Sequence, residues 1–166
     1  TRLYDPISGT IRLGKSNIKN INLEDYRKEI SVVFQDFGKY NLTAGENIHL
    51  GNPNIEYDAN KIRITAETSG ADLYIETFPD KYNTVMGKLF KDGHEVSIGQ
   101  WQKLAVARAL YKTSRFLILD EATSAIDSLA ENNLITRLSI EKSKRGVILI
   151  SHRLPVIKHA DYIYVM

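Results

Sequence analysis

The stretch Phe116-Leu-Ile-Leu-Asp120-Glu121 decides the predicted fold of this chain. Four consecutive apolar residues are typical of a strand buried in a parallel sheet, and this run ends directly in two carboxylates. Open α/β sheets bind ligands at the carboxyl ends of their strands, which is where both acids are expected. There, one carboxylate can hold Mg²⁺ through water while its neighbour orients or deprotonates an attacking water. A solvated turn that caps the next helix is the competing interpretation, and the stretch alone does not decide between the two.

The segments on either side of this stretch predict a parallel sheet. Val147–Ile150 is a second continuous apolar run, and between the two runs Ala130, Leu134 and Leu138 form one apolar stripe of a helix. A strand, a crossover helix and another strand in this order are typical of parallel pairing. Upstream, Ile30–Phe34 is an apolar, β-branched run that predicts a further buried strand. The expected fold class is therefore α/β with a parallel sheet.

A helical insertion is predicted between residues 34 and 116. From Asp58 onward, apolar residues recur at helical spacing until Pro79. Ile98–Tyr111 is apolar on nearly every face, as in a helix that is packed on most sides. We therefore divide a single domain, residues 1–166, into a core of residues 1–45 and 113–166 and a helical subdomain of residues 46–112.

Shorter elements are predicted near both ends of the chain. Thr10–Leu13 alternates as a half-exposed strand does, and Asn22 is expected to cap a helix over Leu23–Lys28. Tyr162–Met166 is predicted to be a last strand. Because the opening has no initiating Met and no signal-peptide pattern, and nothing follows the last strand, we expect both ends to be truncations.

The composition excludes several classes of protein. There are 22 Lys and Arg against 20 Asp and Glu, so no basic stripe is expected and nucleic acid is not an expected partner. The chain has no cysteine, which excludes disulfides, thiolate zinc sites and cysteine nucleophiles. No apolar run approaches the roughly 20 residues that a membrane-spanning helix needs. The chain is thus expected to be a globular domain that does not itself span a membrane.

Polar side chains also follow the other predicted strands. Gln35 and His152 emerge at two strand ends, where an amide can reach Mg²⁺ or water and an imidazole can donate to a phosphate oxygen. Ser97 and Gly99 open the helix at 98–111, where free N–H groups form a cradle for phosphate. Taken singly, each of these is more often an ordinary strand-end residue or helix cap. Their coincidence favours a phosphate-binding site.

The order of these motifs resembles the nucleotide-binding domain of ATP-binding-cassette (ABC) proteins. The family's Q-loop, signature motif, Walker B motif, D-loop and H-loop match, in this order, Gln35, Ser97-Ile-Gly-Gln100, Asp120-Glu121, Ser124-Ala-Ile-Asp127 and His152. The likeness covers nearly the whole chain, and Ser151-His-Arg-Leu154 looks most like exporters in which membrane and nucleotide domains are fused. The resemblance implies a partial P-loop-NTPase-like sheet core with an inserted helical subdomain that carries the signature motif.

The resemblance also implies a role for each motif residue. Glu121 is expected to be the catalytic base, and His152 to contact the γ-phosphate of ATP. Gln35 would sense Mg²⁺ and the attacking water, and Asp120 would hold the Mg²⁺ through water. The signature residues are expected to grip an ATP bound to the opposite subunit; these are Ser97, Ile98, Gly99 and Gln100.

By the same resemblance, the expected partners are a second nucleotide-binding domain and a transmembrane domain. The two nucleotide-binding domains would form a head-to-tail dimer, with Asp127 linking the two active sites. Phe37 and Tyr40 follow the Q-loop, where either docking of a cytoplasmic helix of the membrane domain or plain core packing explains aromatic residues. The expected location is the cytoplasmic face of a membrane. The implied function is ATP hydrolysis coupled to export.

Two departures from the family pattern qualify this expectation. The phosphate loop G-x-x-G-x-G-K-[ST] occurs nowhere in these 166 residues, so we expect this chain by itself neither to bind ATP measurably nor to hydrolyse it. Ile98 stands where the common signature has Gly, so either its backbone has ordinary helical angles or the loop is reshaped. A soluble ABC-type ATPase of translation or DNA repair, and a non-catalytic cassette fragment, are the alternatives that stay open.

Overall fold

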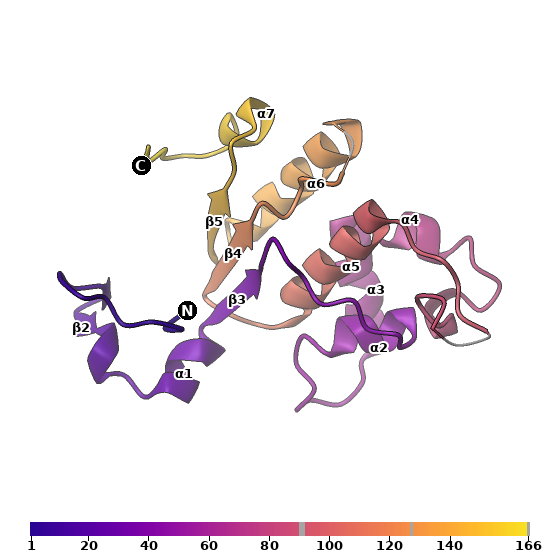
Figure 1. Ribbon diagram of the computed structural model, residues 1–166, viewed down its shortest axis with the longest axis horizontal. Helices are drawn as coiled ribbons and strands as arrows, with labels where there is room; N and C mark the ends of the chain where they lie inside the picture. Colours follow the sequence, from indigo (N-terminus) through magenta and orange to yellow (C-terminus); the bar gives the residue numbers. More distant parts are fainter. Residues whose placement is uncertain (90–91, 127, 166) are drawn as a thin grey trace.

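The computed structural model describes residues 1–89, 92–126 and 128–165, and its centre is a three-stranded parallel sheet (Figure 1). The strands are β3 (Ile30–Val33), β4 (Phe116–Asp120) and β5 (Gly146–Ile150), in the order β3-β4-β5. Val33 lies opposite Leu119, which in turn lies opposite Leu149. The predicted parallel pairing is therefore confirmed, and the three strands end within about one residue of one another.

Seven helices are present among the described residues. They are α1 (Leu23–Lys28), α2 (Ala44–His49), α3 (Ala59–Ser69), α4 (Asp72–Ile75), α5 (Ile98–Tyr111), α6 (Ser128–Glu141) and α7 (Leu154–Ile157). Two 3₁₀ turns, Ile18–Asn20 and Lys81–Asn83, and a two-stranded antiparallel hairpin, β1 (Arg12–Leu13) with β2 (Ser16–Asn17), complete the structure. The predicted Asn22 cap is confirmed, because its side chain accepts hydrogen bonds from the backbone of Glu24 and Asp25.

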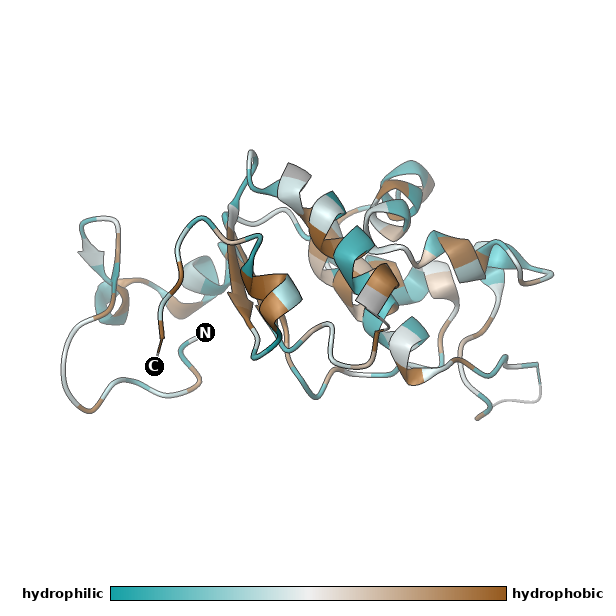
Figure 2. Cartoon of the chain, turned by 90° about the horizontal axis from the view of Figure 1, so that it is seen from above, coloured by the Kyte–Doolittle hydropathy of each residue, from teal (hydrophilic) through white to brown (hydrophobic). Residues whose placement is uncertain are grey.

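One face of the sheet carries the first hydrophobic core. Leu117 and Leu119 of β4 pack with apolar residues of α5 and α6, among them Val106 and Leu134. Helix α6 connects β4 to β5, as the apolar stripe predicted. The two helices lie beside the sheet in Figure 1, and Figure 2 colours the strands mainly as hydrophobic.

The other face of the sheet is open, which corrects the expectation of strands buried on both sides. Ile148 and Ile150 of β5 are 47% and 46% exposed, and Phe34, just past β3, is 45% exposed. The reason is that the described helices of the core pack against one face only, so more buried and more exposed residues alternate along each strand, and β5 is the most exposed of the three.

A second hydrophobic core lies among the helices α2 to α5. Ile48, Ile62 and Ile75 from the shorter helices pack there against Leu104 and Tyr111 of α5. Helix α5 also contributes Val106 and other residues to the first core, so it is buried on both sides. The predicted helix over Ile98–Tyr111 is confirmed, both in its first and last residues and in its packing on most faces.

The predicted last strand is wrong for the described residues 162–165. This segment has no strand geometry, and Tyr162, Tyr164 and Val165 are 83%, 88% and 94% exposed. A strand needs a partner for its backbone N–H and C=O groups, and no described segment pairs with this one.

Among the described residues, no helix is both long and apolar enough to cross a membrane.

Candidate active site

Two of the predicted site residues, Glu121 and His152, meet at the carboxyl end of the sheet. Glu121 follows the last residue of β4, and its backbone N–H donates to the carbonyl of Ile150 at the end of β5. His152 lies two residues beyond β5, and its Nδ1 atom is 3.1 Å from Oε1 of Glu121. The exposed fractions of the two side chains are 28% for Glu121 and 75% for His152. The pair is therefore open to solvent at the sheet edge where ligands bind in such folds.

Two side chains whose oxygen atoms could bind a metal ion, those of Asp120 and Gln35, follow strands at the same edge. Asp120 is the last residue of β4 and pairs in register with Ile150. Gln35 lies two residues past β3, and its side chain is exposed. Val33 is opposite Leu119, and Gln35 and Glu121 each lie two residues beyond this pair. The parallel register thus brings Gln35, Asp120, Glu121 and His152 to one edge.

The signature residues form the start of α5. Ser97 is the N-cap: its hydroxyl accepts from the backbone N–H of Gln100, while the Gln100 side chain accepts from the Ser97 N–H, which is a capping box. Ile98 is the first helical residue and is 60% exposed. Its backbone has ordinary helical angles, so the first of the two possibilities raised by the sequence holds.

The signature residues contact the segment after β4, not the Glu121–His152 pair. A Cβ atom placed on Gly99 would lie 2.7 Å from the carbonyl oxygen of Ala125, so only glycine allows this approach. Within the described residues, the bonds of Ser97 and Gln100 given above link neither residue to Glu121 or His152. Asp127, the predicted link between two sites, lies outside the described residues.

Sequence reasoning missed a buried amide next to this site. Gln102 on α5 is fully buried, donates to the carbonyl of Glu121 and accepts from the N–H of Ala125. The signal that could have revealed it is a polar side chain within a helix that is otherwise apolar on its buried faces.

An ion pair beside the site was also missed. Arg153 follows His152 directly, and its guanidinium lies 2.8 Å from the carboxylate of Glu131, which is 1% exposed. The same guanidinium donates to the carbonyl of Thr123. Arg153 thus ties the segment after β5 to helix α6 and to the turn after β4.

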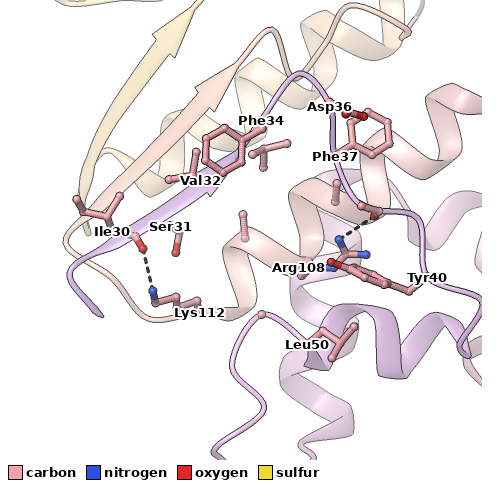
Figure 3. A pocket seen from close by; sticks show the side chains of 15 residues that line it. Ile30, Ser31, Val32, Phe34, Asp36, Phe37, Tyr40, Leu50, Arg108 and Lys112 are labelled. Carbon is pink, nitrogen blue, oxygen red and sulfur yellow. Dashed lines mark hydrogen bonds between the residues drawn. The ribbon is translucent and has the colours of Figure 1, made fainter. Parts of the chain in front are cut away.

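A cavity of about 310 Å³ lies between β3 and the helical part of the chain (Figure 3). Arg108 of α5 donates to the carbonyls of Asn47 and Gly38, and its guanidinium lies 4.6 Å from the ring centre of Tyr40. Burial lowers the pKa of Arg108. Tyr40 is 45% exposed, while Phe37 packs against both hydrophobic cores. Phe37 and Tyr40 both line the cavity, but Phe37 is partly buried against the two cores whereas Tyr40 is exposed.

Comparison with known proteins identifies relatives over nearly the full chain. The family model described as "ABC transporter" matches residues 1–124. The chain is 41% identical to "ABC transporter B family member 29, chloroplastic" of Arabidopsis thaliana, over 99% of this chain and 26% of that protein. It is 39% identical to "Subtilin transport ATP-binding protein SpaT" of Bacillus subtilis, over 100% of this chain and 27% of that protein.

A solved structure agrees with this relationship. The chain is similar to a structure titled "Structure of a bacterial Atm1-family ABC exporter with ATP bound", with a TM-score of 0.87 and 31% identity over 96% of this chain and 27% of that one. The chain thus spans about a quarter of the length of these relatives. With the family model, the relatives and the parallel sheet in agreement, the chain belongs to the ABC transporter family, as an ATP-binding domain related to those of exporters.

Proposed function

We propose that, within the full-length protein, this domain takes part in hydrolysing MgATP held between two copies and thereby drives export across a membrane. The observation that carries the proposal is the contact between Glu121 and His152 at the carboxyl edge of the parallel sheet. A carboxylate there can accept a proton from water, and an imidazole next to it can reach a terminal phosphate. The relatives whose names mention export or transport support the coupling to export.

Within this proposal, Glu121 is the general base and His152 contacts the γ-phosphate. Gln35 lies at the same edge with an exposed amide, suited to orient the attacking water. The N-terminus of a 14-residue helix, with its dipole, favours phosphate, which supports Ser97, Ile98, Gly99 and Gln100 as the contacts to the partner's ATP. Asp127 keeps its proposed role as the link between the two sites.

The donor set at the sheet edge fits Mg²⁺ in the presence of nucleotide. Asp120 supplies a carboxylate and Gln35 an amide oxygen, both of the hard type that Mg²⁺ prefers. The described residues contain no group of three or more acidic, His or Cys side chains that would form an all-protein metal site. This fits an ion held by one or two side chains together with phosphates and waters. When bound, Mg²⁺ would neutralise charge on the phosphates.

We also propose that the cavity beside β3 receives a segment of the transmembrane domain. Tyr40 offers an exposed aromatic ring, stacked on Arg108, at the rim of this cavity. Rigid aromatic side chains of this kind are frequent anchors at interfaces. In the full-length protein, Tyr40→Ala should lower transport per ATP hydrolysed without loss of stability, whereas Phe37→Ala should also lower stability because Phe37 packs against both cores. This docking would put the domain at the cytoplasmic face of the membrane.

The division into a core of residues 1–45 and 113–166 and a helical subdomain of residues 46–112 also stays a proposal. The two hydrophobic clusters support it, with α5 as the element that both share.

The experiment compares the full-length protein with this 166-residue chain. The full-length protein should bind MgATP at micromolar concentration and release phosphate from it. The 166-residue chain should give no measurable heat with ATP in an isothermal titration, because each missing charge-assisted bond to phosphate weakens binding by roughly 1.5–3 kcal/mol. Absence of ATP hydrolysis by the full-length protein would refute the proposal, and micromolar binding by the 166-residue chain would refute its expected inactivity.

A further inference from the structure

The buried amide of Gln102 bridges two main-chain groups of the turn that follows β4. Its Nε2 donates to the carbonyl oxygen of Glu121 at 3.1 Å, and its Oε1 accepts from the N–H of Ala125 at 3.0 Å. Because a backbone N–H can only donate, the second bond fixes which end of the amide is oxygen. The side chain is 0% exposed, so both bonds form away from water. We call residues 121–126 the β4–α6 turn.

Glu121 has an unusual backbone conformation that needs such support. Its φ is +48°, in the left-handed region that residues other than glycine, asparagine and aspartate rarely adopt. A conformation of this kind persists only where surrounding contacts over-determine it. The Glu121 carbonyl accepts from the Ser124 N–H within the turn and from Gln102 outside it. The first donor belongs to the turn itself, whereas the second is a side chain of another element, helix α5.

A second contact holds the same turn against α5. The Ala125 carbonyl lies over Gly99, where any Cβ would be only 2.7 Å away. Gly99 and Gln102 are three residues apart on α5, and therefore lie on the same face of the helix. Together they seat the β4–α6 turn on the first turns of the helix that Ser97 caps.

We propose that Gln102 is a positioning residue that holds the Glu121 main chain in its left-handed conformation and links it to the signature end of α5. This inference rests on the function proposed above. Five residues, or about 7.5 Å of helix, separate Gln102 from Ser97. A shift of α5 when Ser97 meets the partner's ATP is therefore passed to the Glu121 carboxylate of the same chain, which acts on the other ATP. Gln102 thus connects the two ATP sites of the dimer through one chain, from Ser97 at one ATP to Glu121 at the other.

The test is ATP hydrolysis by the full-length protein with Gln102→Met. Methionine keeps the length and burial of the side chain but makes none of its hydrogen bonds, including the longer one of 3.4 Å from Nε2 to the Ser124 hydroxyl. Release of the Glu121 main chain should lower kcat by about ten- to a hundred-fold, while KM for MgATP stays within about two-fold, since Gln102 does not face the nucleotide. Ser69→Ala is the matched control: Ser69 is a buried hydroxyl at the end of α3 that bridges the Ala66 carbonyl and the Ala71 N–H, and its loss should leave kcat unchanged.

A second variant separates positioning from simple loss of packing. In Gln102→Glu, a protonated carboxyl can donate to Glu121 and accept from Ala125, whereas a carboxylate repels the Glu121 carbonyl. Burial raises the pKa of such a carboxyl, so the kcat of Gln102→Glu relative to wild type should rise several-fold from about pH 8 to about pH 6. Among the described residues, the charged groups around the turn include Asp120, Glu121 with His152, and Arg153 with Glu131. They are the same in both proteins, so their own titration cancels in this ratio, and the ratio for Gln102→Met should stay flat.

The outcomes distinguish this inference from the proposed function. If wild type hydrolyses ATP and Gln102→Met retains its kcat, or loses kcat only as much as Ser69→Ala does, the positioning role is wrong and the proposed function stands. A Gln102→Glu ratio that does not change with pH would also contradict the positioning role. If wild type itself hydrolyses no ATP, the proposed function has failed and with it the site that Gln102 would position.

Discussion

The Nδ1 atom of His152 lies 3.1 Å from Oε1 of Glu121, so the proposed base and the proposed phosphate contact are bonded to each other. An ionised carboxylate only accepts hydrogen bonds, so Nδ1 must carry a proton in this contact. In a neutral imidazole, Nε2 is then an acceptor and cannot donate to a phosphate oxygen. His152 must therefore become doubly protonated or leave Glu121 before it can donate to the γ-phosphate. Binding of the γ-phosphate by His152 would therefore change the hydrogen bond that His152 makes with the proposed base, Glu121.

Replacing Glu121 by glutamine should separate ATP binding from hydrolysis. The amide has the same shape but cannot take a proton from water, so the hydrolysis rate of the full-length protein should fall by about 10²- to 10⁴-fold. ATP affinity should be retained, because the amide can donate to Nδ1 of His152 and leave Nε2 protonated toward the phosphate. Phosphate release and equilibrium ATP binding measure the two effects. Glu67→Gln, an exposed acid on α3, is the control, and equal loss of activity in both variants would refute the role of Glu121.

Removing the charge of Arg153 should destabilise the domain. Glu131 is 1% exposed, and its carboxylate pairs with Arg153 at 2.8 Å. Arg153→Met leaves this buried carboxylate without its partner, which costs about 3–5 kcal/mol of unfolding free energy. Urea unfolding of the purified protein measures this loss. The double variant Arg153→Met with Glu131→Leu should recover most of it, and a double variant no more stable than the single one would contradict the ion-pair explanation.

The start of α2 offers a test that depends on pH. Thr43 and Glu46 form a capping box, and the hydrogen bonds from the Thr43 backbone N–H and hydroxyl lower the pKa of Glu46. A carboxyl whose pKa is lowered on folding stabilises the protein above its unfolded pKa, and this contribution is lost as the pH falls through its folded pKa. Thr43→Ala should cost about 1 kcal/mol at pH 7 and less in acid.

Thermal unfolding at neutral and acidic pH measures the difference between Thr43→Ala and wild type. Thr68→Ala removes a hydroxyl that donates to the Ile64 carbonyl within α3, so it is a suitable control whose effect should not vary with pH. A Thr43→Ala difference that grows on acidification would show that Glu46 does not contribute in this way.

At the signature, Ile98→Gly should raise the ATPase rate of the full-length protein, by less than about tenfold. Ile98 has helical angles, so this expectation rests on its side chain and not on backbone strain. The side chain is 60% exposed at the first position of α5, next to the helix N–H groups that the partner's phosphates would approach. Steady-state hydrolysis measures the effect, and an unchanged or lower rate would count against it.

The parallel sheet and the long helices could be predicted because their signals are local. Apolar runs give β4 and β5, and the Asn22 cap and the α5 boundaries follow from residue types within one or two turns. The strand predicted over residues 162–166 was wrong for the described residues 162–165, because an apolar run does not say whether a pairing partner is present. The open face of β5 was missed for the same reason: burial depends on what packs from elsewhere.

The candidate site could be predicted at the level of strand ends, but its internal contacts could not. The parallel register brings Gln35, Glu121 and His152 to one edge, as the sequence indicated. The direct contact between Glu121 and His152, and the bridge from Gln102, depend on side-chain directions across 31 and 19 residues of chain. Such pairs leave no periodic pattern in a single sequence.

The measurement that tests the account most directly uses dimers of the full-length protein made from two different chains. In one pairing, Glu121→Gln is in one chain and Ser97→Arg in the other; in the second, one chain carries both substitutions and its partner neither. If Glu121 of one chain acts on an ATP gripped by Ser97 of the other, the first pairing keeps one intact site and hydrolyses ATP, while the second keeps none. Higher activity in the second pairing, or equal activity in both, would mean that Glu121 and Ser97 do not share an ATP across two copies.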